Sequence, residues 1–135
     1  MMKKTEELTG LALDYAVAMC EFPRLDTVGA QCAGEEVFRK GDALYIEGGF
    51  LDRHDIYYSP STVWRQGGPI IELVKIELRE FTGVWSARLS RMQHKVGQNV
   101  LSYHSCTADT PLVAAMRCYV SSALGAEIEF PEGFD

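Results

Sequence analysis

Long apolar runs are absent from this sequence. The longest, residues 11–20, is interrupted by Asp14 and falls well short of the roughly 20 apolar residues that a membrane-spanning helix needs. The N-terminus begins with two methionines and two lysines, but two glutamates follow where a secretory signal would have its apolar segment. We therefore expect a soluble, cytoplasmic protein that does not enter a membrane.

Metal-binding and cofactor-binding patterns are also missing. The four cysteines, Cys20, Cys32, Cys106 and Cys118, form no CxxC pair and no cluster with histidine, which indicates reduced thiols and no metal site. The chain has no phosphate-binding loop and no recognisable pairing of a nucleophile with a base. The sequence thus predicts no cofactor.

Histidines, the usual general bases near neutral pH, are few. The chain has three, His54, His94 and His104. His104 and Cys106 are two residues apart and would share one face of a strand, although isolated residues of these types are far more often structural. We expect a protein that is not an enzyme, and the alternative is a small enzyme with a histidine-based site.

Basic residues are too few to balance the acidic ones. The chain has 13 lysines and arginines against 19 aspartates and glutamates, for a formal net charge of −6. Because nucleic-acid binding needs a basic surface that displaces counterions, this balance disfavours direct contact with nucleic acid. A protein partner is expected instead, and self-association is possible.

Two amphipathic segments predict the main helices. Apolar residues recur at three- and four-residue spacing in residues 9–20, with Thr9 as a plausible N-cap and with Asp14 and Ala18 expected away from the buried face. The same spacing recurs in residues 111–124, where Thr110 is the expected N-cap. With 135 residues and 47% hydrophobic content, the chain has the size and composition of one domain, residues 1–135.

The clearest strand signal is a hairpin. If Thr82 and Gly83 form a two-residue turn, residues 76–80 pair with 85–89, which places Leu78 opposite Ala87 and gives one apolar face. The same register sets Glu77 opposite Arg88 on the other face. Further strands are expected at residues 43–50, 99–104 and 127–130, and a variable loop at 23–42 with a helical turn near residues 35–39. These elements predict an α+β fold: a small antiparallel sheet with two main helices packed on it.

The 57–69 segment concentrates backbone constraints and aromatic side chains. Two prolines and a Gly-Gly pair predict a defined turn. Trp64 is expected to be mostly buried as a plug over the core, with Tyr58, Arg65 and Gln66 at the rim, while the alternative is that it anchors a partner. We list as candidate ligand- or partner-binding residues Tyr57, Tyr58, Ser59, Trp64, Arg65, Gln66 and Arg117. For Arg117, on the second helix, an internal salt bridge is the favoured alternative.

Three blocks of sequence resemble a known family. They are ELTGLALDYAVA at residues 7–18, YSPSTVWRQGGPIIE at 58–72 and TPLVAAMRCYV at 110–120. In this order and spacing they are similar to the NinX-like proteins of tailed phages and their prophages. Tyr15 stands where the family tends to have tryptophan, and residues 23–55 depart most from the pattern. The family brings no known activity or catalytic residues, so the resemblance implies a phage accessory protein and little about chemistry.

These observations together favour one functional class. We expect a non-enzymatic accessory protein in the host cytoplasm that binds a host or phage protein through the 57–69 segment. An acidic inhibitor of a host-defence or nucleic-acid enzyme is one alternative, and an assembly protein with an apolar self-interface is another.

Overall fold

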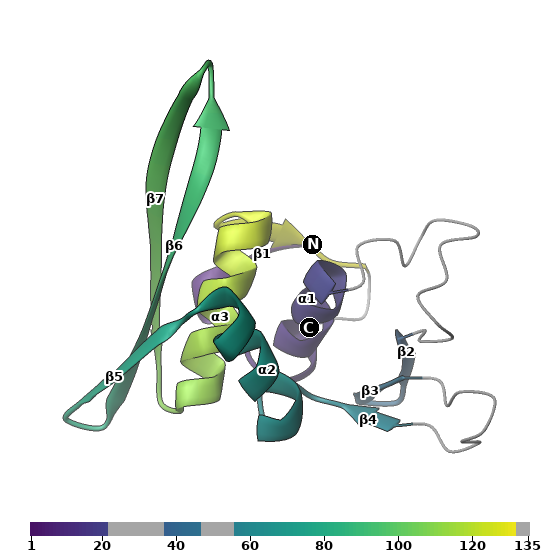
Figure 1. The fold of residues 1–135 in the computed structure, drawn as a ribbon. Helices are drawn as coiled ribbons and strands as arrows, with labels where there is room; N and C mark the ends of the chain where they lie inside the picture. Colours follow the sequence, from purple (N-terminus) through teal and green to yellow (C-terminus); the bar gives the residue numbers. More distant parts are fainter. Residues whose placement is uncertain (22–36, 47–55, 132–135) are drawn as a thin grey trace.

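The structure, a computed structural model, describes residues 1–21, 37–46 and 56–131, and it has an α+β fold (Figure 1). The described part contains three α-helices, one more than the two main helices expected from the sequence. The elements in chain order are β1 Met2–Lys4, the 3₁₀ helix η1 Thr5–Glu7, α1 Gly10–Glu21, β2 Val37–Lys40, β3 Ala43–Ile46, β4 Ile56–Tyr58, α2 Trp64–Val74, β5 Glu77–Phe81, β6 Val84–Lys95, β7 Gln98–Ala108, α3 Pro111–Leu124 and β8 Glu127–Glu129.

The main core lies around α3, which sits between the antiparallel β5-β6-β7 sheet and α1 (Figure 1). Apolar spacing places a stripe of α3 side chains in this core, including Met116 and Val120, both fully buried. They pack with Leu13 and Val17 of α1 and with Leu89 of β6. The helix predicted at residues 111–124 is confirmed, and its N-cap is Thr110, whose Oγ1 accepts a hydrogen bond of 3.3 Å from the backbone N–H of Val113.

The predicted hairpin register is confirmed. Glu77 pairs with Arg88 and Leu78 with Ala87, and the strands are joined at Thr82 and Gly83, with φ values of 50° and 87°. Two successive positive φ values define the turn type that matches the twist of a two-residue hairpin. The next strand is longer than expected, because β7 extends over residues 98–108 rather than 99–104, and it pairs with all but the first residue of β6.

A small sheet joins the two ends of the described chain. Strand β1, which the sequence analysis missed, pairs antiparallel with β8, the strand expected near residues 127–130. The Met1 ammonium donates a 3.0 Å hydrogen bond to the carbonyl of Phe130, and the Thr5 hydroxyl lies 3.0 Å from the carbonyl of Ala126. Phe130 is thereby held in the main core, where its ring lies 5.8 Å from that of Tyr15.

The third sheet, β2-β3-β4, corrects one prediction. Residues 37–40 form a strand that turns through Gly41, at φ 66°, into β3, so the helical turn expected near residues 35–39 is wrong where the structure describes it. The local sequence has no strong periodicity, and pairing with β3 decides its conformation. Residues 23–36 of the predicted loop, residues 47–50 of the predicted strand and His54 lie outside the described residues.

The helix predicted at residues 9–20 is confirmed as α1, but the orientation expected for two of its residues is wrong. Asp14 and Ala18 are 5% and 0% exposed. Ala18 packs with Leu44 of β3 and Tyr58 of β4 in a second, smaller core, so a second face of the helix is also covered. In the described part of the chain, no helix is both long and apolar enough to cross a membrane.

Candidate binding surface

The 57–69 segment is not a single turn, as predicted, but the end of a strand, a turn and the start of a helix. Strand β4 ends at Tyr58, the backbone N–H of Val63 closes the turn onto the carbonyl of Ser59 at 2.8 Å, and α2 begins at Trp64. Gly67, Gly68 and Pro69 therefore lie inside a helix, despite their poor helical propensity. Tertiary contacts outweigh that local preference.

Asp14 of α1 holds the turn through hydrogen bonds to Ser59 and Ser61. Its buried carboxylate accepts a 2.8 Å hydrogen bond from the Ser59 hydroxyl and a 2.9 Å bond from the backbone N–H of Ser61. Burial raises the pKa of Asp14 above its ordinary value, and the bonds from Ser61 and Ser59 oppose that rise. Ser59, a candidate ligand contact, is 2% exposed and serves as part of this internal network.

Gln66 fastens the first turn of α2 to β4. Its side-chain oxygen accepts from the Ser59 N–H at 2.6 Å, and its Nε2 donates to the Tyr57 carbonyl at 2.6 Å. One amide side chain thus satisfies two backbone groups, one within β4 and one just after its end. Gln66 acts within the protein, although the sequence analysis placed it at a binding rim.

Gly67 lets α2 approach α3. A Cβ built at this position would overlap the carbonyl oxygen of Pro60 and lie 2.6 Å from Cδ2 of Leu112 on α3. A Cβ at Gly68 would meet only the Trp64 ring, at 3.9 Å. The first glycine is therefore required by close packing, whereas the second is not.

The exposure of the aromatic residues reverses what we expected from the sequence. Trp64 is 55% exposed, whereas Tyr58 is 5% exposed and belongs to the second core. Tyr57, on the opposite face of β4, is 49% exposed, and Arg65 is also exposed. Burial could not be read from the Pro/Gly-rich context, because it depends on which side of the turn α1 and α3 cover.

Tyr57 is one end of an aromatic row that the sequence analysis missed. Pairing across the β2-β3-β4 sheet sets Phe38 opposite Tyr45 and Tyr45 opposite Tyr57. The ring centroids are 6.0 Å apart for the first pair and 5.9 Å for the second. The other face of this sheet packs on α1, so Phe38, Tyr45 and Tyr57 form its outer face, which we call the aromatic face. No signal in the sequence could have found it, because the three residues come from strands whose pairing was not predicted.

The Arg117 guanidinium donates hydrogen bonds to two backbone carbonyls. Its Nε donates to the carbonyl of Leu8 at 2.7 Å and its NH1 to the carbonyl of Thr107 at 2.8 Å. The guanidinium thereby joins α3 to the segment before α1 and to the end of β7. Its partners are main-chain oxygens, where the sequence analysis favoured an internal salt bridge.

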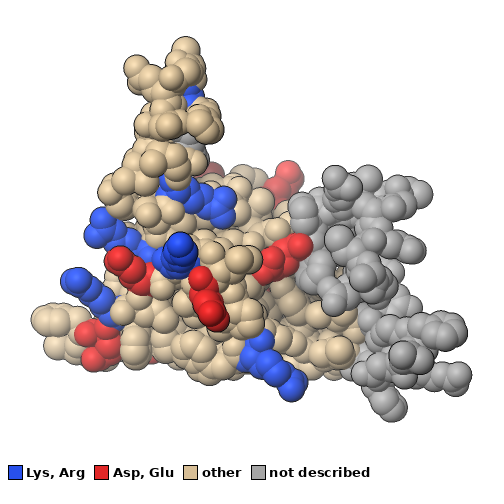
Figure 2. All heavy atoms as spheres, in the orientation of Figure 1, with Lys and Arg blue, Asp and Glu red and all other residues tan. Residues whose placement is uncertain are grey.

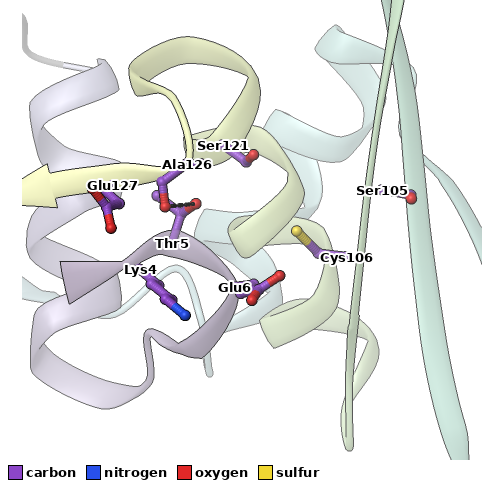
Figure 3. A pocket seen from close by; sticks show the side chains of 8 residues that line it. All are labelled: Lys4, Thr5, Glu6, Ser105, Cys106, Ser121, Ala126 and Glu127. Atoms are coloured by element: carbon purple, nitrogen blue, oxygen red, sulfur yellow. Dashed lines mark hydrogen bonds between the residues drawn. The ribbon is translucent and has the colours of Figure 1, made fainter.

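The residues considered for catalysis, His104 and Cys106, lie away from the 57–69 segment. A shallow hollow of about 380 Å³ lies between η1, β7, α3 and β8, with the Cys106 side chain pointing into it and Ser105 pointing away (Figure 3). Burial raises the pKa of the Cys106 thiol, so it holds its proton near neutral pH. His104 does not line the hollow, and its Nε2 lies 3.5 Å from the Ser102 hydroxyl. Within residues 1–21, 37–46 and 56–131, no group of three or more histidine, cysteine, aspartate or glutamate side chains could hold a metal ion.

The fold and the exposed aromatic residues define a small α+β protein with a hydrogen-bonded strand–turn–helix segment at its surface. A family model described as Bacteriophage P22, NinX matches residues 4–123. The chain belongs to this phage NinX family, in agreement with the resemblance seen in its sequence blocks. Among curated proteins, none matches the chain.

Proposed function

We propose that this phage accessory protein acts by binding a host or phage protein in the cytoplasm of the host cell, without chemistry of its own. The contact surface consists of the exposed part of the 57–69 segment, Tyr57, Trp64 and Arg65, together with the neighbouring aromatic face. Tryptophan, tyrosine and arginine are the residue types that most often dominate binding energy at protein interfaces.

The observation that supports this proposal is the combination of exposure with a rigid frame. Trp64 is 55% exposed, yet it begins a helix that is held at its start: Asp14 bonds to the turn before it, and Gln66 in its first turn bonds to β4. Such a side chain loses little conformational freedom when a partner covers it, which favours affinity. Of the remaining candidates, Tyr58, Ser59, Gln66 and Arg117 then serve to support the surface.

The test is capture of proteins from phage-infected cells by the tagged chain, with identification by mass spectrometry. The double variant Tyr57→Ala/Trp64→Ala is expected to lose proteins that the parent retains, while its melting temperature stays close to that of the parent. The matched control is Leu73→Gln, which changes another exposed apolar side chain of α2, 80% exposed. A double variant that retains every partner of the parent would contradict the proposed surface.

A further inference from the structure

The charges of this chain are unevenly distributed along it. Residues 84–108, which include β6 and β7, contain three basic residues, Arg88, Arg91 and Lys95, and neither aspartate nor glutamate. The remaining residues carry the other ten basic side chains and all 19 acidic ones. An acidic protein thus has one hairpin of opposite charge.

The end of this hairpin projects from the rest of the protein. The pairing of β5 with β6 ends at Arg88, and beyond it β6 pairs only with β7, up to Lys95 opposite Gln98. We call residues 92–101 the arm; its described side chains are all exposed, and Figure 1 shows it extending beyond the helices. Figure 2 shows acidic and basic side chains interspersed on the body below it.

The arm exposes several apolar side chains although it is a two-stranded hairpin with no further strand or helix of the described residues covering it. Met92 and Leu101 pair across the strands and are 61% and 45% exposed, and Val100 is 39% exposed. Val96, in the turn, has a φ of 48° and is fully exposed. A lone two-stranded hairpin is at best marginally stable in water, and clustered exposed apolar side chains are typical of interaction sites.

We propose that the arm docks against the acidic body of a second copy of this chain, so that two copies exchange arms in a symmetric dimer. The chain itself supplies charge of both signs: an exposed apolar arm that carries Lys95 and no carboxylate, and, outside residues 84–108, a body in which 19 acidic residues outnumber ten basic ones. In a two-fold arrangement each contact occurs twice, which doubles the area that one short arm can bury.

Nucleic acid is the less suitable occupant. The arm itself offers one lysine, Lys95, for phosphate contacts, since Arg91 is partly buried at its base and Arg88 lies over the Tyr103 ring at 4.6 Å. Met92, Val100 and Leu101 would gain little from a phosphate backbone, and the acidic body would repel it. A protein surface can cover the apolar side chains and attract Lys95 at the same time.

The experiment is light scattering coupled to gel filtration, from about 1 to about 100 µM protein, a range that covers weak and moderate dimers. The arm variant is Lys95→Glu/Leu101→Gln, and Met92→Gln is a milder second variant. The matched control, Lys75→Glu/Leu73→Gln, makes the same chemical changes at exposed positions on and just after α2. Circular dichroism verifies folding of each variant.

We expect the parent and the control to dimerise, with a dissociation constant that rises with salt, and the arm variant to raise that constant at least about tenfold. Hydrogen exchange of residues 92–101 in the parent should slow with protein concentration. A parent that stays monomeric at about 100 µM, or an arm variant that dimerises as the control does, would overturn the proposal. Arm-dependent binding of a labelled DNA duplex by a monomeric parent would assign the arm to nucleic acid instead.

Discussion

The Ser59 hydroxyl donates a 2.8 Å hydrogen bond to the carboxylate of Asp14, 45 residues earlier in the chain. Both side chains are buried, at 2% and 5% exposed. Because Asp14 lies on α1 and Ser59 begins the turn before α2, this bond fixes the direction in which α2 leaves the turn. The exposed position of Trp64 thus depends on a buried carboxylate that is not itself part of the surface.

Removal of the Asp14 carboxylate should destabilise the protein more than any change to the exposed residues. Asp14→Ala leaves the Ser61 N–H buried without its acceptor, which costs about 1–3 kcal/mol. The Ser59 hydroxyl also loses its bond to Asp14 and keeps only its contact with the Thr62 hydroxyl, at 2.6 Å. Urea unfolding at neutral pH measures the loss. A stability equal to that of the parent would show that the turn is held by other contacts.

Asp14→Asn separates the charge from the hydrogen bonds. The asparagine oxygen can accept from the Ser61 N–H, and its amide can donate to the Ser59 hydroxyl. Because burial raises the folded-state pKa of Asp14, the native protein binds a proton more readily than the unfolded chain, and this group's contribution to stability is lost as pH rises through that pKa. The asparagine variant should therefore gain stability relative to the parent as the pH rises above about 4, the ordinary pKa of an aspartate. A pH-independent difference would contradict the raised pKa.

The two glycines of α2 should respond in opposite directions to alanine. Gly67→Ala forces a methyl group against Pro60 and Leu112 and should cost about 1–3 kcal/mol. Gly68→Ala adds helix propensity with only a 3.9 Å contact to Trp64 and should be neutral or stabilising by up to about 1 kcal/mol. Thermal unfolding of both variants provides the comparison. Equal effects would mean that α2 does not pack closely on α3 at Gly67.

Alanine substitution should destabilise the protein much more at Tyr58 than at Trp64. Tyr58→Ala empties part of the second core and should cost about 3–5 kcal/mol, whereas Trp64→Ala should change the free energy of unfolding by less than about 1 kcal/mol. Chemical denaturation distinguishes the two. A large loss for Trp64→Ala would restore the prediction that this residue is a plug.

Three thiols should react slowly in the folded protein. Burial raises the pKa of Cys20 and of Cys118 to about 12, and it raises the pKa of Cys106 as well. In a Cys32→Ser variant at about pH 8, little thiolate is present at these positions, so a chromogenic disulfide reagent should label them much faster in urea than in buffer. Rapid labelling in buffer would show that one of the three is accessible and acidic.

The sequence by itself determined the elements whose signals are local. The register of the β5-β6 hairpin, with Glu77 opposite Arg88, follows from the Thr82-Gly83 turn and from two side-chain patterns that agree. Helices α1 and α3 follow from apolar spacing and, for α3, from the Thr110 cap. The family also could be identified from three short blocks. These features need only neighbouring residues to be read together.

Only the tertiary structure decided which side chains face outward. Gly67 lies in a helix because α2 packs closely on α3 there, and Ile70 of the same helix is buried in the main core. Trp64 is exposed because the bonds of Asp14 and Gln66 place it on the side of α2 that faces away from this core. The aromatic face and the arm likewise depend on strand pairing between distant segments and on where the sheet ends. Burial and pairing are sums over residues far apart in the chain, so no local pattern contains them.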